Sequence, residues 1–229
     1  MNFYWSSTRH PWPCLLFILP LLVIYEGSML YQTMEGMQPY RAGIDQWLAN
    51  LCKQNQMPAE YLPSLMIAVI GIGWAVVKWD RSPPESWTLV AGMFLESLAL
   101  SLALWGLGVV VTSQLSHLSI NTRTLQAVAL MGSGIFEEIL FRLLGFGLLY
   151  WLFKSVVQDR TALVLSLMIS AFGFAAAHCL GPQGEAWEWK ICLFRSMGGV
   201  YFGLLFHYRG LGIAVGTHCA YNVLVGLLG

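Results

Sequence analysis

Two adjacent carboxylates and an arginine lie in the middle of a long apolar segment that runs from about residue 125 to residue 153. They are Glu137, Glu138 and Arg142. If the segment lies in a bilayer, each charge near mid-depth costs about 3 kcal/mol on insertion scales, so residues of this kind usually have a function. On a helix Glu138 and Arg142 share a face, whereas Glu137 is rotated by roughly 100°. One carboxylate can therefore be neutralised by the arginine while the other stays free to react.

Two later apolar segments carry polar groups that could join this pair. In the first, His178 follows Phe174 by one helical turn, and in the second, His218 and Asn222 are four residues apart. Residues with a spacing of four share a helix face. Such side chains are costly against lipid, and helices can gather them in one shared polar cavity. We expect Phe174 to form a wall of that cavity.

An acid, two imidazoles and an amide together can hydrolyse a peptide bond. An apolar cavity raises the pKa of a carboxyl group, whereas a nearby arginine lowers it. The balance of the two effects would let Glu137 act as the general base that deprotonates a water. His178 would share that water or protonate the leaving amine. Asn222, with His218 as a second donor, would stabilise the oxyanion of a tetrahedral intermediate, an effect worth roughly 3 kcal/mol per donor.

A zinc site is the alternative for the same residues. Glu137, His178 and His218 have the ligand types of a catalytic zinc site, two histidines and one carboxylate with a place left for water. The chain contains no HExxH motif, and Asn222 suits an oxyanion role. We therefore favour the glutamate-dependent mechanism, in which no cofactor is required and zinc remains the alternative.

Other charged residues in apolar segments have structural interpretations. Glu138 and Arg142 are expected to form a supporting ion pair that positions the reactive glutamate. Glu96 and Arg195, in two further apolar segments, are expected to support the fold or to neutralise each other. The histidine and asparagine of the last segment could instead tie two helices together by a hydrogen bond.

The three motifs occur in the order of a known family. Glu137-Glu138-x-x-x-Arg142, Phe174-x-x-x-His178 and His218-x-x-x-Asn222 resemble those of the CPBP family of intramembrane proteases (CAAX proteases and bacteriocin-processing enzymes, or Abi). This family includes the Ras-converting type of CAAX endopeptidase. The resemblance covers about residues 125–229 and implies a multi-helix α-fold whose catalytic cavity lies inside the membrane. It also implies Glu137 as the base, His178 as its partner, and His218 with Asn222 as oxyanion donors. Family members have been described both as metalloproteases and as metal-free glutamate proteases.

The composition is that of an integral membrane protein. Of the 229 residues, 57% are hydrophobic and 10% are charged, whereas a soluble domain has about 25% charged residues. Twelve basic residues balance twelve acidic ones, so no basic excess points to a nucleic-acid partner. The five cysteines have no C-x-x-C spacing and indicate neither a disulfide framework nor a cysteine metal site. We predict a single multi-pass domain over residues 1–229, in the plasma membrane if the source is bacterial.

Seven segments approach the roughly 20 apolar residues that a spanning helix needs. They cover residues 12–31, 61–79, 86–111, 125–153, 161–180, 189–208 and 211–228. The fourth is too long for one straight span, and its glycines permit a bend or a split. Residues 44–52 form either a short amphipathic interfacial helix or a loop, and prolines are expected to end helices in 78–84 and at 181–182. The predicted fold is all-α, a polytopic transmembrane helical bundle of about seven spans with the catalytic cavity inside the membrane.

These patterns predict an intramembrane endopeptidase that acts on membrane-associated peptides or proteins, with prenylated, CAAX-like tails as one candidate class. The alternative is a non-proteolytic membrane scaffold or immunity protein that uses the same cavity to bind a partner. A proton-coupled transporter is a third interpretation, since glutamates and histidines in spans also build proton relays. No inverted repeat is visible in the sequence, which argues against the transporter.

Overall fold

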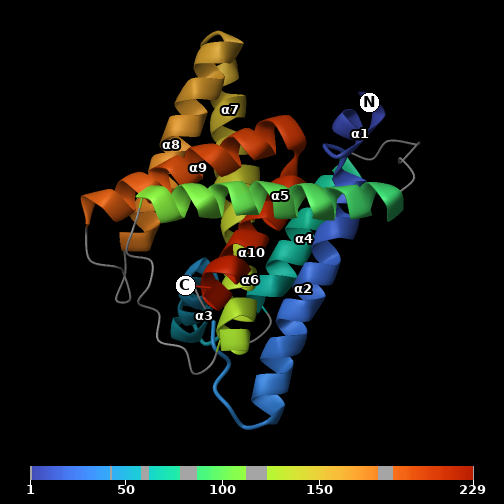
Figure 1. Cartoon of the computed structure of the whole chain (residues 1–229), viewed down its shortest axis with the longest axis vertical. Coiled ribbons are helices and arrows are strands. Elements are labelled where there is room, and N and C mark those ends of the chain that lie inside the picture. The colour runs from blue at the N-terminus through green and yellow to red at the C-terminus, as the bar shows by residue number, and fades with distance from the viewer. Residues whose placement is uncertain are drawn as a thin grey trace.

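All regular elements in the described residues are helices. The computed structural model describes residues 2–41, 43–57, 62–77, 87–111, 123–179 and 188–228 (Figure 1). The helices are α1 (Asn2–Ser7), α2 (Pro11–Met34), α3 (Gly43–Gln54), α4 (Leu62–Val77), α5 (Trp87–Val111), α6 (Arg123–Glu138), a π-helical segment (Ile139–Phe146), α7 (Gly147–Lys154), α8 (Asp159–Cys179), α9 (Trp189–Arg209) and α10 (Leu211–Leu228). The all-α prediction is confirmed for these residues. The predicted helix ends in 78–84 and at 181–182 lie outside the described residues.

In the part of the chain that the structure describes, three helices are long and apolar enough to cross a membrane. They are α2, α5 and α8, and α10 is an apolar helix of shorter length. The chain therefore has the helices of an integral membrane protein, but the predicted count of seven spans is not confirmed. The long helices also do not all run side by side, because α5 lies across the direction of α2 and α10 (Figure 1).

The long fourth segment forms one continuous run of helix whose middle is π-helical. The π-helical segment begins directly after Glu138 and ends where α7 begins at Gly147. Short π-helical stretches inside α-helices widen the turn and occur frequently at functional sites. The predicted split into two separate helices is therefore not present, and a π-helical segment that contains Arg142 lies at this position instead.

The segment after α2 is the amphipathic helix α3 rather than a loop. Its buried residues are Asp45, Ala49 and Cys52, which have the spacing of three and four that marks one helix face. Trp47 and Leu51 on the other side are exposed. Helix α3 packs against α6, and its exposed apolar side chains suit a membrane interface.

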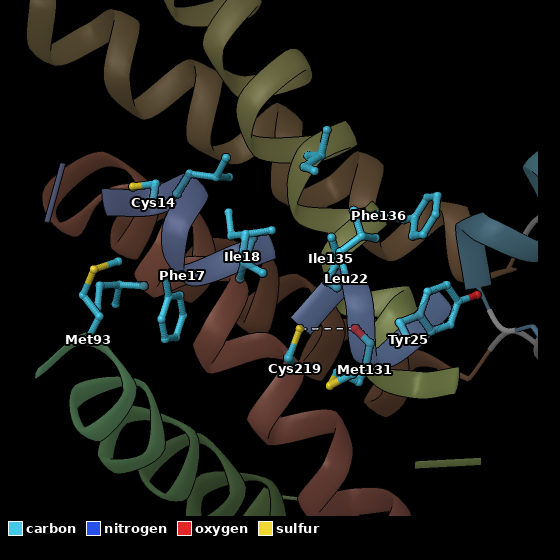
Figure 2. Close-up of a cluster of buried hydrophobic side chains, with 14 of the residues drawn as sticks. Cys14, Phe17, Ile18, Leu22, Tyr25, Met93, Met131, Ile135, Phe136 and Cys219 are labelled. Carbon is cyan, nitrogen blue, oxygen red and sulfur yellow. Dashed lines mark hydrogen bonds between the residues drawn. The ribbon is translucent and has the colours of Figure 1, made fainter. Parts of the chain in front are cut away.

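The core that holds the later helices lies where α2, α6 and α10 meet (Figure 2). Tyr25 of α2 packs edge-on against Phe136 of α6, with their ring centroids 6.1 Å apart. The Sγ atom of Cys219 in α10 donates a hydrogen bond to the carbonyl oxygen of Met131 in α6 at 3.2 Å (Figure 2). A Cβ added at Gly134 would lie 3.2 Å from the backbone nitrogen of Cys219. A glycine at 134 therefore lets α10 approach α6 closely.

Glu96 of α5 pairs with Arg209 at the end of α9. The Arg209 guanidinium donates to both Glu96 carboxylate oxygens, from Nε at 2.7 Å and from Nη2 at 2.8 Å. Tyr4 of α1 donates its hydroxyl proton to the same carboxylate at 2.7 Å. The prediction that Glu96 and Arg195 neutralise each other is wrong, because a two-pronged arginine–carboxylate pair already occupies Glu96.

Candidate active site

Three helices bring one glutamate and two histidines together. Glu137 lies at the end of α6, His178 at the end of α8 and His218 within α10. Glu137 Oε2 lies 3.8 Å from Nε2 of His178 and 3.6 Å from Nε2 of His218. These separations exceed a direct hydrogen bond but suit a bridging water. Glu137 is only 2% exposed, so a group held there is shielded from bulk solvent.

The second carboxylate oxygen of Glu137 is held by its own helix. Ser133, one turn earlier on α6, donates a short hydrogen bond to Oε1 of Glu137. With Oε1 engaged in this way, Oε2 is the oxygen that faces the two imidazoles. Sequence reasoning did not single out Ser133, although its position four residues before Glu137 places it on the same helix face.

Glu138 holds His218 in a fixed orientation. The Nδ1 atom of His218 lies 2.8 Å from Oε1 of Glu138, and both side chains are buried. An ionised carboxylate can only accept a hydrogen bond, so Nδ1 carries the proton. The Nε2 atom that faces Glu137 then carries a proton only when His218 is an imidazolium.

Arg142 supports Glu138 from the π-helical segment. Its Nε atom lies 3.3 Å from Oε2 of Glu138, and neither side chain is exposed. The Nη2 atom donates to the carbonyl oxygen of Gly199 at 3.3 Å, and the guanidinium carbon lies 4.5 Å from the centre of the Phe174 ring. A cation over an aromatic face is attracted to it. Arg142 therefore links α6 to α8 and α9 behind the carboxylate pair.

Aromatic rings pack around both histidines. The Phe174 ring lies 4.9 Å from the His178 ring and 5.9 Å from the His218 ring, and Phe202 of α9 stacks on His218 at 4.3 Å. The Nδ1 atom of His178 lies 2.8 Å from the carbonyl oxygen of Phe174, an acceptor, so Nδ1 carries the proton and Nε2 faces Glu137. Phe174 is thus placed as a wall between the two imidazoles, whereas Phe202 had no signal in the sequence.

Asn222 lies one helical turn beyond His218, but it does not join the cluster directly. Its side-chain nitrogen donates to the carbonyl oxygen of Leu130 at 2.8 Å, which ties α10 to α6. Within the described residues, no hydrogen bond links Asn222 to Glu137 or to either histidine. An amide nitrogen has two N–H groups, and the bond to Leu130 uses one of them.

The residues proposed as zinc ligands do not form a metal-binding group. In the described part of the chain, no three His, Cys, Asp or Glu side chains are arranged to hold a metal ion. Glu137, His178 and His218 are among the side chains to which this applies. The choice between the glutamate mechanism and the zinc alternative stays a prediction, and the proposed reaction assigns no step to a metal.

Residues 124–224 match the family model described as type II CAAX prenyl endopeptidase Rce1-like. The matched segment contains all three motifs, and the resemblance to the CAAX proteases that these motifs predicted is thereby confirmed for this segment. Comparisons with curated proteins and with solved structures gave no match.

Proposed function

We propose that this chain, with its Rce1-like segment over residues 124–224, is an intramembrane endopeptidase that hydrolyses a peptide bond of a membrane-associated substrate. The family match suggests an intramembrane protease, and three membrane-length helices suggest an integral membrane location. The observation that carries the proposal is the placement of Glu137 Oε2 within 3.8 Å of His178 Nε2 and 3.6 Å of His218 Nε2. A carboxylate and two imidazoles around one buried point can activate a water.

In the proposed reaction Glu137 acts as the general base. A water between Glu137 and the imidazoles gives one proton to Oε2, and its oxygen bonds to the carbonyl carbon of the substrate. The negative charge that develops on the carbonyl oxygen is stabilised by the second N–H of Asn222 and by Nε2–H of imidazolium His218. Donors that are already in place when charge develops lower the barrier most effectively.

The second half of the reaction returns the proton. His178 Nε2 faces the Glu137 carboxyl, so it can take the proton from Glu137 and pass it to the substrate nitrogen. The C–N bond then breaks, and the products are a new carboxyl group and a free amine. Glu138 and Arg142 take no proton in this scheme, because they orient His218 and fix the end of α6.

The proposed substrates are peptides or proteins presented at the membrane. The matched family is described as prenyl endopeptidases, so prenylated proteins with CAAX-like tails are the first class to test. A buried site in a chain that has membrane-length helices suits a substrate that reaches it from the bilayer. The proposal involves no nucleic acid and no required cofactor.

The test is cleavage of a membrane-tethered peptide by the purified protein in proteoliposomes, followed by mass spectrometry of the products. Prenylated and unprenylated forms of one CAAX peptide are compared. We expect cleavage by the wild-type protein, its loss in Glu137→Ala and His178→Ala, and its retention in Glu35→Ala, which changes an exposed glutamate at the end of α2. A folded wild-type protein that binds a partner but cleaves neither peptide would instead favour the scaffold interpretation.

A further inference from the structure

The first residue of α3 lies against the glutamate of the site. Gly43 has a φ of +59°, a backbone conformation that glycine adopts at little cost. A Cβ added to Gly43 would lie 2.7 Å from Oε1 of Glu137 and would overlap the hydroxyl oxygen of Ser133. Gly43 is exposed whereas Glu137 is buried. The bare backbone at Gly43 therefore covers Oε1 on the side that faces out of the molecule.

A buried polar network holds this backbone in place. Arg41 Nη1 donates to both carboxylate oxygens of Asp45, at 3.0 and 2.8 Å. Tyr25 of α2 donates its hydroxyl proton to the same carboxylate. Asp45 and Tyr25 are fully buried, and Arg41 is nearly so. Burial raises the pKa of the Asp45 carboxyl and the Arg41 guanidinium lowers it, so the network depends on each partner.

Arg41 and Asp45 lie on either side of Gly43 in the chain, and Tyr25 connects Asp45 to α2. These contacts fix the position of Gly43 relative to α2 and α6. The ring of Tyr25 packs closely against the backbone of α6 at Gly132, where an added Cβ would overlap the ring. This contact holds Tyr25 in place. The catalytic scheme above uses neither Gly43 nor the network.

We infer that Gly43 is a positioning residue for Glu137, and that Tyr25, Arg41 and Asp45 hold it there. This inference rests on the proposed function. Ser133 and the Gly43 backbone together confine Oε1, which leaves Oε2 directed at the water shared with the two imidazoles. A side chain at position 43 would push the carboxylate out of this orientation. Misplacing a catalytic group by about 1 Å can cost roughly 100-fold in rate.

The test compares Gly43→Ala with Gly36→Ala. Gly36 has a similar φ of +71°, but a Cβ there would meet nothing within 4 Å. Both substitutions impose the same kind of backbone strain, and only the first contacts Glu137. We expect kcat of peptide cleavage to fall by about tenfold to 100-fold in Gly43→Ala, with KM unchanged. In Gly36→Ala both constants should stay at the wild-type values, while the unfolding temperature falls through the backbone strain alone.

A second readout does not require activity. A hydrophobic carbodiimide labels accessible carboxyl groups, and mass spectrometry locates the label on Glu137. We expect Gly43→Ala to change the labelling rate of Glu137 several-fold and Gly36→Ala to leave it at the wild-type rate. If wild-type protein fails to cleave any peptide, the proposed function is wrong, and the labelling still decides the role of Gly43.

Tyr25→Phe provides the test if Gly43→Ala does not fold. The substitution removes only the hydroxyl that donates to Asp45, and we expect it to lower kcat and to alter labelling of Glu137 in the same direction, by a smaller factor. Kinetics and labelling of Gly43→Ala that equal those of Gly36→Ala would overturn the inference. If Gly43→Ala cannot be purified, a Tyr25→Phe variant with wild-type kcat and wild-type labelling of Glu137 would overturn the inference in the same way.

Discussion

Nδ1 of His218 in α10 lies 2.8 Å from Oε1 of Glu138 in α6, although the two residues are 80 positions apart in the chain. The contact gives the second glutamate of the pair two partners, since its other oxygen faces Arg142. It also determines which imidazole nitrogen faces Glu137. The two adjacent glutamates therefore have different surroundings, because Oε2 of Glu137 faces both imidazoles while Glu138 orients one of them.

Glu138→Gln should impair catalysis while leaving substrate binding intact. A glutamine amide can donate to Nδ1 of His218 and so favour the wrong tautomer. The corresponding change in a serine protease lowers kcat by about 10⁴-fold, and we expect a loss of about 100-fold or more here. Steady-state kinetics on the membrane-tethered peptide provide kcat and KM separately. Glu188→Gln, at an exposed residue before α9, serves as the control, and wild-type kcat in Glu138→Gln would refute this role.

Arg142→Met should destabilise the protein, because it leaves the buried Glu138 carboxylate without its cation. Breaking one side of a buried ion pair costs about 3–5 kcal/mol. Thermal unfolding in detergent is the measurement, with Arg160→Met at an exposed position of α8 as the matched control. The double variant Arg142→Met/Glu138→Gln should lose less stability than the sum of the two single variants, since the pair is coupled. Strict additivity would show that the two groups do not interact.

Asn222→Ala separates an oxyanion role from a purely interhelical one. If the amide stabilises the oxyanion, kcat falls by about 100-fold or more, with KM nearly unchanged, and this is the expected result. Loss of the hydrogen bond to Leu130 by itself would lower stability by about 0.6–2 kcal/mol and leave kcat as it is. Asn55→Ala removes a similar amide-to-carbonyl bond at an exposed site and should change neither kcat nor KM.

Metal removal should leave activity unchanged. We expect protein that elemental analysis shows to be free of zinc and other divalent metals to cleave the peptide at the wild-type rate. The reason is that the reacting water is activated by the Glu137 carboxylate in the proposed scheme. Activity that disappears with a chelator and returns with added zinc would contradict the glutamate mechanism.

The sequence could identify those candidate site residues whose polar side chains are energetically costly in an apolar segment. A charge or an imidazole in such a segment requires a partner, and the spacing of four residues placed Glu138 near Arg142 before any fold was known. The chain order of the motifs indicated the family. The structure brings Glu137 together with His178 and His218, while the catalytic roles of these residues remain predictions.

The features that escaped prediction are those without a costly side chain. Gly43 and Ser133 are small residues whose importance comes from their position next to Glu137, and this position is visible only in the folded structure. Arg209 and Arg195 lie on the same helix and have the same charge, so composition could not reveal which one pairs with Glu96. The span count was not confirmed either, because only three helices in the described residues have the length and apolar composition of a span.

The most direct test is kcat of metal-free Glu137→Gln on the membrane-tethered peptide. Glutamine keeps the size of the side chain and can still accept from Ser133, but it cannot take a proton from water. We predict a fall in kcat of at least about 10³-fold, in line with the 10²–10⁴-fold contribution of a general base, with unchanged folding and normal activity of Glu35→Gln. Cleavage by Glu137→Gln at the wild-type rate would contradict the claim that this carboxylate activates the water.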